Sequence, residues 1–257
     1  MRALALIRFP IEKTVDNEDF CIYPLKFCKL LKEKYNINFD CLSLSKYSSN
    51  YSICYDYGAD KTYIIEDVKF SGMDTNMTAK ILANFISESD INYDIIVSFI
   101  LSDYGETAHV PSGVASYLNI PFVYAVKQLT DLTEKELFCK YINPSTVVEV
   151  RSTYPIVISL HYQFEFPYNI APSLFDVYNA KNKEIINISS AFFKRDFVES
   201  IIPKTQIIDG KINTIIKQSS LPTKKNANIQ ETIEMLSNLI LKRDKLWTKK
   251  LFLFVIL

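Results

Sequence analysis

The chain has 257 residues, of which 48% are hydrophobic, so it can bury the core of one large α/β domain with an appendage or of two small domains. Its 29 basic residues balance 29 acidic ones, which argues against nucleic acid as the main partner because no long-range field would attract it. Five scattered cysteines without a C-x-x-C pair, after a start with too few apolar residues for a secretory signal, predict a reducing, cytoplasmic location.

About the first 125 residues alternate short apolar runs with amphipathic stretches, which is typical of repeated βα units. Strands are expected at Arg2–Ile7, Phe39–Leu44, Lys61–Ile65, Tyr93–Phe99 and Pro121–Lys127. Helices are expected at Ile22–Tyr35, in a short segment that ends at Gly58, behind the N-cap residue Asp74, and at His109–Leu118. These elements predict a Rossmann-like, doubly wound, mainly parallel sheet of five strands.

The pattern changes after residue 127. Three more strands with short turns between them predict an antiparallel excursion from the parallel core. They span Glu136–Ile142, Val147–Arg151 and Ile156–His161.

An aromatic loop at Phe164–Pro172 and a short helix within Ser173–Lys183 follow the three strands. The polar, poorly periodic residues 185–220 predict an extended arm, and Asn228–Lys242 has apolar residues at helical spacing. We therefore divide the chain into an α/β domain, residues 1–184, and a C-terminal arm with a helix, residues 185–257.

The last seven residues, Leu251–Leu257, are all apolar. A membrane span needs roughly 20 such residues, so this run favours a terminal strand over a membrane anchor and predicts no stable membrane insertion.

The segment Ser102–Pro111 is the most informative part of the sequence for function, because it follows the apolar strand Tyr93–Phe99 and opens a helix. Free N–H groups at such a helix start attract phosphate, Gly105 allows close approach of the backbone, and Thr107 offers a hydroxyl. On spacing alone, an ordinary βα turn with a threonine cap is the somewhat better explanation of the segment. Neither a nucleophile–base arrangement nor metal-ligand spacing can be assembled, so we predict no catalytic residues and no metal site.

Four motifs occur in one order along roughly residues 1–190. They are Y-G-A-D-K at 57–61, D-T-N-M-T-A at 74–79, G-E-T-A-H-V at 105–110 followed by L-N-I-P at 118–121, and P-S-L at 172–174 followed by N-A-K-N-K at 179–183. They resemble M-G-A-D-R/K, A-D-T-x-x-T-A, D-G-D-T-A-Q-V-G-P with L-G-x-P, and P-S-L-P-N-I-M-K-A-K-K-K of the electron transfer flavoprotein beta subunit family.

This resemblance implies a site for AMP, or for a second FAD, between the ends of strands one and two and the loop before the helix at residue 109. The residues that it assigns to this site are Leu6, Arg8, Ser45, Asp103, Gly105, Glu106, Thr107, Ala108, His109 and Val110. It also implies that Leu174 docks onto a dehydrogenase, and that the arm and helix of residues 185–257 pack on a partner subunit.

By the same resemblance, the partner is an alpha subunit that holds the main FAD, and the pair passes electrons from a dehydrogenase, such as an acyl-CoA dehydrogenase, to an acceptor. The chain departs from the family at Phe99-Ile100-Leu101-Ser102-Asp103-Tyr104-Gly105, where the family has G-x-Q-A-x-D-G. That departure keeps open an alternative, an adenine-nucleotide-binding sensor or scaffold of the same fold without electron transfer.

Overall fold

The structure is a computed structural model that describes residues 1–8, 22–45, 49–100, 108–143 and 146–203. All of these residues belong to one compact unit, Met1–Ile208. The expected helix Asn228–Lys242, the part of the expected arm after residue 203 and the apolar tail lie outside the described residues. The division at residue 184 stays a prediction. Among the described helices, none is long and apolar enough to cross a membrane.

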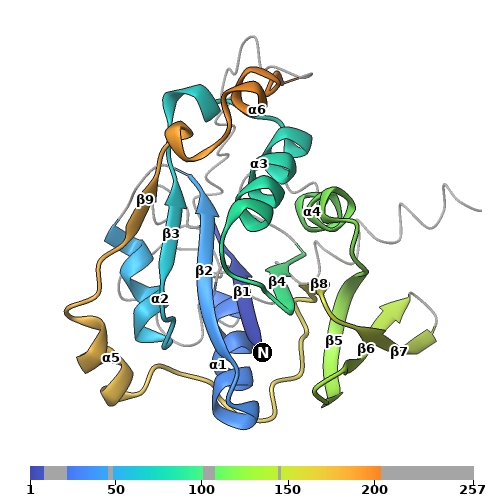
Figure 1. Cartoon of the computed structure of the whole chain (residues 1–257). Helices are drawn as coiled ribbons and strands as arrows, with labels where there is room; N and C mark the ends of the chain where they lie inside the picture. Colours follow the sequence, from blue (N-terminus) through green and yellow to red (C-terminus); the bar gives the residue numbers. More distant parts are fainter. Residues whose placement is uncertain (9–21, 46–48, 101–107, 144–145, 204–257) are drawn as a thin grey trace, which may run out of the picture. The chain divides into compact units, whose positions relative to one another are not determined.

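A nine-stranded sheet forms the centre of this unit, in the order β7-β6-β5-β8-β4-β1-β2-β3-β9 (Figure 1). From β5 to β9 in that order, each strand is parallel to the next one, whereas β6 is antiparallel to both β5 and β7 at one edge. The predicted α/β class, with a mainly parallel sheet and an antiparallel excursion, is confirmed. The strands are β1 (Arg2–Leu6), β2 (Asn38–Leu44), β3 (Thr62–Ile65), β4 (Ile95–Phe99), β5 (Phe122–Leu132), β6 (Glu136–Asn143), β7 (Thr146–Thr153), β8 (Ile156–Leu160) and β9 (Ile186–Ile188).

Helices cover both faces of the sheet, as a doubly wound fold requires. Side chains alternate along a strand, so Ala3 and Ala5 of β1 face one hydrophobic core and Leu4 and Leu6 face the other. The first core includes α1 and α2, and the second includes α3 and α4. The helices are α1 (Ile22–Tyr35), α2 (Ile53–Asp56), α3 (Thr75–Glu88), α4 (Val110–Leu118), α5 (Leu174–Ala180) and α6 (Arg195–Glu199), with 3-10 turns η1 (Ser49–Ser52), η2 (Val68–Phe70) and η3 (Ser190–Phe192).

Helix α3 shows how local sequence determines these elements. Its N-cap residue Asp74 accepts a hydrogen bond from the Met77 N–H at 2.8 Å, which satisfies one of the free donors of the first turn. Behind it, Ile81, Leu82 and Phe85 are buried on one stripe. The cap is as predicted from the sequence, and the buried stripe packs the helix on the sheet.

Strand β8 corrects the predicted topology. It was expected in the antiparallel excursion, but it lies between β4 and β5 and is parallel to both. All five of its residues, Ile-Val-Ile-Ser-Leu, are buried, as is typical of a strand that is covered on both faces. The expected core of five strands was also too small, because β8 joins it and β9, inside the expected arm, extends it beyond β3.

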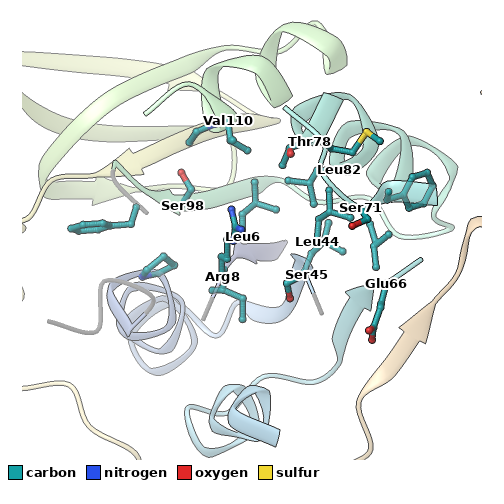
Figure 2. A pocket seen from close by; sticks show the side chains of 18 of the residues that line it. Leu6, Arg8, Leu44, Ser45, Glu66, Ser71, Thr78, Leu82, Ser98 and Val110 are labelled. Carbon is teal, nitrogen blue, oxygen red and sulfur yellow. The ribbon is translucent and has the colours of Figure 1, made fainter. Parts of the chain in front are cut away.

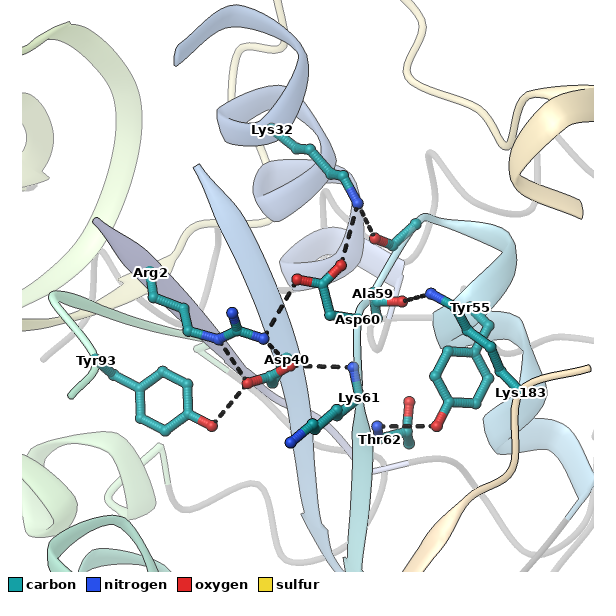
Figure 3. Close-up of polar contacts among 11 residues, drawn as sticks. Arg2, Lys32, Asp40, Tyr55, Ala59, Asp60, Lys61, Thr62, Tyr93 and Lys183 are labelled. Atoms are coloured by element: carbon teal, nitrogen blue, oxygen red, sulfur yellow. Dashed lines mark hydrogen bonds and ion pairs between the residues drawn. The ribbon is translucent and has the colours of Figure 1, made fainter. Parts of the chain in front are cut away.

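The edge of the sheet at the start of the strands carries a buried charged cluster (Figure 3). Asp40 is fully buried and accepts two hydrogen bonds from the Arg2 guanidinium, at 2.7 and 2.8 Å. Its oxygens also accept the Tyr93 hydroxyl at 2.9 Å and the Lys61 N–H at 3.0 Å. The hydrogen bond with Asp40 raises the pKa of Arg2, so the guanidinium keeps its positive charge.

Candidate functional site

The opposite edge of the sheet holds the candidate site. After β1, the chain adds β2 and β3 on one side of it and then places β4 on its other side. The order in which strands are added therefore reverses at β1. Ligands of open α/β sheets bind at the carboxyl ends of the strands, next to such a reversal. The ends of β1, β2, β3 and β4 meet there, and α3 and α4 cover the same face.

A cavity of about 830 Å³ lies at this edge (Figure 2). Figure 2 shows Leu6, Leu44 and Ser45 at the strand ends, with Thr78 of α3 and Val110 of α4 on the side of the helices. Its lining is Leu6, Ile7, Arg8, Pro24, Leu42, Leu44, Ser45, Ile65, Glu66, Asp67, Val68, Phe70, Ser71, Gly72, Met73, Thr78, Leu82, Ser98, Phe99, Ile100, Ala108, Val110 and Pro111. A cavity of this size with an apolar floor and few polar groups has the character of a small-molecule site.

The structure brings part of the predicted site together. The predicted residues that line the cavity are Leu6, Arg8, Ser45, Ala108 and Val110. His109 is the N-cap of α4, is exposed and does not belong to the lining. The other predicted residues, Asp103, Gly105, Glu106 and Thr107, lie outside the described residues.

Ser98 is a polar residue of the cavity that the sequence prediction missed. It is 5% exposed, and among the described residues its Oγ is buried and has no hydrogen-bond partner. A buried hydroxyl without a partner costs about 1–3 kcal/mol, so a ligand atom in the cavity that bonds the Ser98 Oγ would relieve this cost. The signal was a serine inside the otherwise apolar strand Ile95–Phe99.

Asp67, also missed, belongs to the wall of the cavity. Its Oδ1 accepts the Lys69 N–H at 2.9 Å and its Oδ2 accepts the Ser190 N–H at 2.8 Å. The hydrogen bond with Ser190 is the main cause that lowers the pKa of Asp67 to about 2, so the carboxylate is charged at neutral pH. Because Ser190 is distant in sequence, no local sequence pattern indicates this contact.

Phe99 packs at the rim of the cavity without filling it. Its ring lies 4.8 Å from the ring of Tyr23, centroid to centroid, and it belongs to the core on the α1 face of the sheet. The expected departure from the family at this position therefore leaves the space on the α3 and α4 face open. Tyr104 lies outside the described residues.

Leu174 lies far from the cavity lining, at the start of α5, where it is 91% exposed. Phe175 and Tyr178 on the same helix are also exposed, so α5 presents an apolar surface. Helix α5 is anchored by the pair between Lys29 of α1 and Asp176. Burial disfavours the charged form of Lys29, but its hydrogen bonds with Asp176 and Glu33 outweigh burial and raise its pKa.

The chemistry that this arrangement supports is binding. The start of α4 carries the positive end of a helix dipole, Arg8 is cationic, and the floor of Leu6, Leu42 and Leu44 suits a flat heterocycle. Within the described lining, we find no nucleophile next to a general base.

Comparisons with known proteins agree with this picture. The family model described as "Electron transfer flavoprotein domain" matches residues 48–187, more than half of the chain. Electron transfer flavoprotein subunit beta from Thermoanaerobacterium thermosaccharolyticum is 30% identical over 135 residues, which are 52% of this chain and 50% of that protein. The match therefore spans about half the length of the relative. The matched region runs from η1 to β9 and includes β3, α3, β4, α4 and α5.

Proposed function

The chain belongs to the electron transfer flavoprotein family, and from that premise we propose that it is the beta-type subunit of a heterodimeric electron carrier. The relative in the comparison is itself a beta subunit. In this proposal, an alpha-type subunit holds the FAD that carries electrons from a dehydrogenase, such as an acyl-CoA dehydrogenase, to an acceptor. The four cysteines within the described residues are free and buried, which supports a location in the cytoplasm.

The cavity at the ends of β1 to β4 is proposed to hold the adenine nucleotide of this subunit, AMP or a second FAD. The observation that carries this assignment is the buried, unpartnered Oγ of Ser98 next to the start of α4. A phosphate there would accept hydrogen bonds from Ser98 and from the free N–H groups of the helix, and the positive end of the helix dipole would favour its charge. The predicted residues Asp103, Gly105, Glu106, Thr107 and His109 remain candidates for the same phosphate.

In this proposal, the described residues position the nucleotide and the partners, and none of them is a redox group. Leu6, Leu44 and Val110 would hold the base away from water, while Arg8 and Ser45 would face the sugar or the phosphate. FAD, bound mainly by the alpha subunit, supplies the electron transfer. The beta chain would then keep the nucleotide, the partner subunit and the dehydrogenase in fixed relation.

Helix α5 is proposed as the part that docks onto the dehydrogenase. Its exposed Leu174, Phe175 and Tyr178 form a compact apolar surface on a helix that the Lys29–Asp176 pair fixes to α1. Apolar side chains that a short helix presents to water are typical of an interaction site.

Co-expression with an alpha-type subunit tests the proposed function. We expect a yellow 1:1 complex that releases AMP or FAD on denaturation, identified by chromatography and mass spectrometry. A chain that co-purifies with no alpha-type partner and releases no adenine nucleotide would overturn the proposal.

The alternative is an adenine-nucleotide sensor or scaffold without electron transfer. The sequence departure that begins at Phe99 motivates it, because the family has glycine where this chain has a ring at the cavity rim. The two proposals differ in one result: the sensor would bind the nucleotide alone, without a flavin-bearing partner and without reduction by a dehydrogenase.

A further inference from the structure

One wall of the cavity is the segment Glu66–Met73, which follows β3 and contains η2. We call it the wall segment. All of its residues except Lys69 line the cavity. A ligand in the cavity would therefore touch this segment directly.

A second segment, residues 186–201, contains β9, η3 and α6, and we call it the clasp. Figure 1 shows it in orange, running from the edge of the sheet beside β3 to α6. Strand β9 pairs with β3 in parallel, and the pairing continues past the strand because the Glu66 N–H donates to the Ile188 carbonyl at 3.0 Å. The clasp is thus bonded to the first residue of the wall segment.

Asp67 joins the two segments through a single carboxylate. One oxygen caps η2 in the wall segment by accepting the Lys69 N–H, and the other accepts the Ser190 N–H at the start of η3 in the clasp. Moving the clasp away would leave Oδ2 without its donor, and unfolding η2 in the wall segment would leave Oδ1 without its donor. The position of the wall segment and that of the clasp therefore depend on each other.

An aromatic contact links the same two segments. Phe70 lines the cavity and also meets Phe193 of the clasp edge to face, with ring centroids 5.3 Å apart. Both rings are buried, and Phe193 is 5% exposed. Such a pair contributes beyond its buried area, and undocking the clasp would expose the ring that backs the cavity wall.

The contacts of the clasp with α3 include exposed polar pairs. Lys194 pairs with Glu88, and Lys80 bonds the Ser200 hydroxyl at 3.0 Å. Exposed pairs of this kind stabilise little. Together with the ring contact between Phe192 and Phe85, the contacts at Asp67 and Phe193 therefore hold much of the clasp in place.

We propose that Asp67 is a positioning residue that couples ligand binding in the cavity to docking of the clasp. A ligand that orders the wall segment favours the docked clasp, and by thermodynamic reciprocity the docked clasp raises the affinity for the ligand by the same factor. The inference rests on the proposed function, because the ligand is the adenine nucleotide that we assign to this cavity.

The test compares the full chain with its Asp67→Asn variant, with AMP as the probe. Asparagine keeps one acceptor oxygen but replaces the other with an NH2 group, which cannot accept the second N–H. We expect the variant to bind AMP about five- to tenfold more weakly by calorimetry, within the usual range of coupling between sites. Hydrogen exchange should show that AMP slows exchange over residues 186–201 in the natural chain and not in the variant.

Glu88→Gln is the matched control, because it removes a carboxylate that also contacts the clasp but does not line the cavity. It should leave both the AMP affinity and the protection of residues 186–201 unchanged. If AMP binds the natural chain but exchange over the clasp does not respond, or if Asp67→Asn binds AMP as well as the natural chain does, the coupling is wrong and the nucleotide site stands. If neither AMP nor FAD binds the natural chain, the nucleotide site itself is wrong and the coupling falls with it.

Discussion

We expect the Ser98 hydroxyl to lower the stability of the nucleotide-free chain and to strengthen AMP binding, so one substitution tests both expectations. Its buried Oγ has no partner within the described residues, so Ser98→Ala should raise the free energy of unfolding of the nucleotide-free chain by up to about 1 kcal/mol. The same change should weaken AMP binding about three- to tenfold, the value of one hydrogen bond. Chemical denaturation and calorimetry measure the two quantities.

Ser159 is the matched control for this change. It is the register partner of Ser98 on β8, is equally buried, and its Oγ accepts the Ala125 N–H at 3.1 Å. Ser159→Ala leaves that N–H unpaired and should lower the free energy of unfolding by about 1–2 kcal/mol without a specific loss of AMP affinity. Equal behaviour of the two variants would contradict the assignment of Ser98 to the ligand.

Asp40 illustrates a residue that serves stability alone. Asp40→Asn removes the charge that a largely buried guanidinium faces, so we expect a loss of about 2–3 kcal/mol in denaturation experiments, at the lower end for broken buried pairs because Arg2 is partly exposed. Asp60→Asn, which removes the partly exposed second partner of Arg2, should cost less than about 1 kcal/mol. AMP affinity should be unchanged in both, since the cluster lies at the other end of the strands, and a change in it would contradict the separation of the two edges.

At the scale of elements, the contact between α3 and α4 depends on Gly113. A Cβ built on Gly113 would lie 2.7 Å from the Cβ of Ala79, so the helices approach too closely for two methyl groups. Gly113→Ala should lower the free energy of unfolding by about 1–3 kcal/mol, despite the better helix propensity of alanine. Adding Ala79→Gly should restore part of the loss, and thermal denaturation of the three variants checks this.

Helix α5 should matter for electron transfer and not for stability. Leu174→Ser changes a side chain that is almost fully exposed, so the free energy of unfolding should stay within about 0.5 kcal/mol. The rate at which an acyl-CoA dehydrogenase reduces the reconstituted complex should fall at least tenfold. Val147→Ser, at an exposed apolar position of β7, is the control and should leave this rate unchanged. Equal rates for Leu174→Ser and the natural chain would remove α5 from the docking surface.

Regular elements could be predicted from the sequence wherever periodicity is local. Helix α1 has the predicted bounds, and the N-cap residue Asp74 marks the start of α3 as predicted. The place of β8 could not be predicted, because an apolar run shows that a strand is buried but not which strands it lies between.

The candidate site was predicted where it depends on strand ends, since Leu6, Arg8 and Ser45 line the cavity. Asp67 escaped prediction because its role depends on Ser190, which is 123 residues away. Ser98 stands out as the serine of an otherwise apolar strand, but this pattern does not show that its hydroxyl lacks a partner.

At the scale of the whole molecule, the buried charged cluster around Asp40 and the candidate binding cavity lie at opposite edges of one sheet. If the cavity binds AMP in the native state and not in the unfolded chain, AMP at about 100 times its Kd should add about 2.7 kcal/mol to the free energy of unfolding. Removing the nucleotide should lower Tm accordingly, and scanning calorimetry with increasing AMP measures the shift. A Tm that does not depend on AMP would contradict the assignment of the cavity.

The position of β8 has a consequence for synthesis of the chain. Strands β4 and β5 are made first, but they do not touch, because β8 lies between them and pairs with both. At roughly 5–20 residues per second, the stretch of about 60 residues from the end of β4 to the end of β8 takes several seconds to translate. During that time the backbone N–H and C=O groups along one edge of β4 lack their native partner strand, and an unpaired edge of this kind is a site of aggregation.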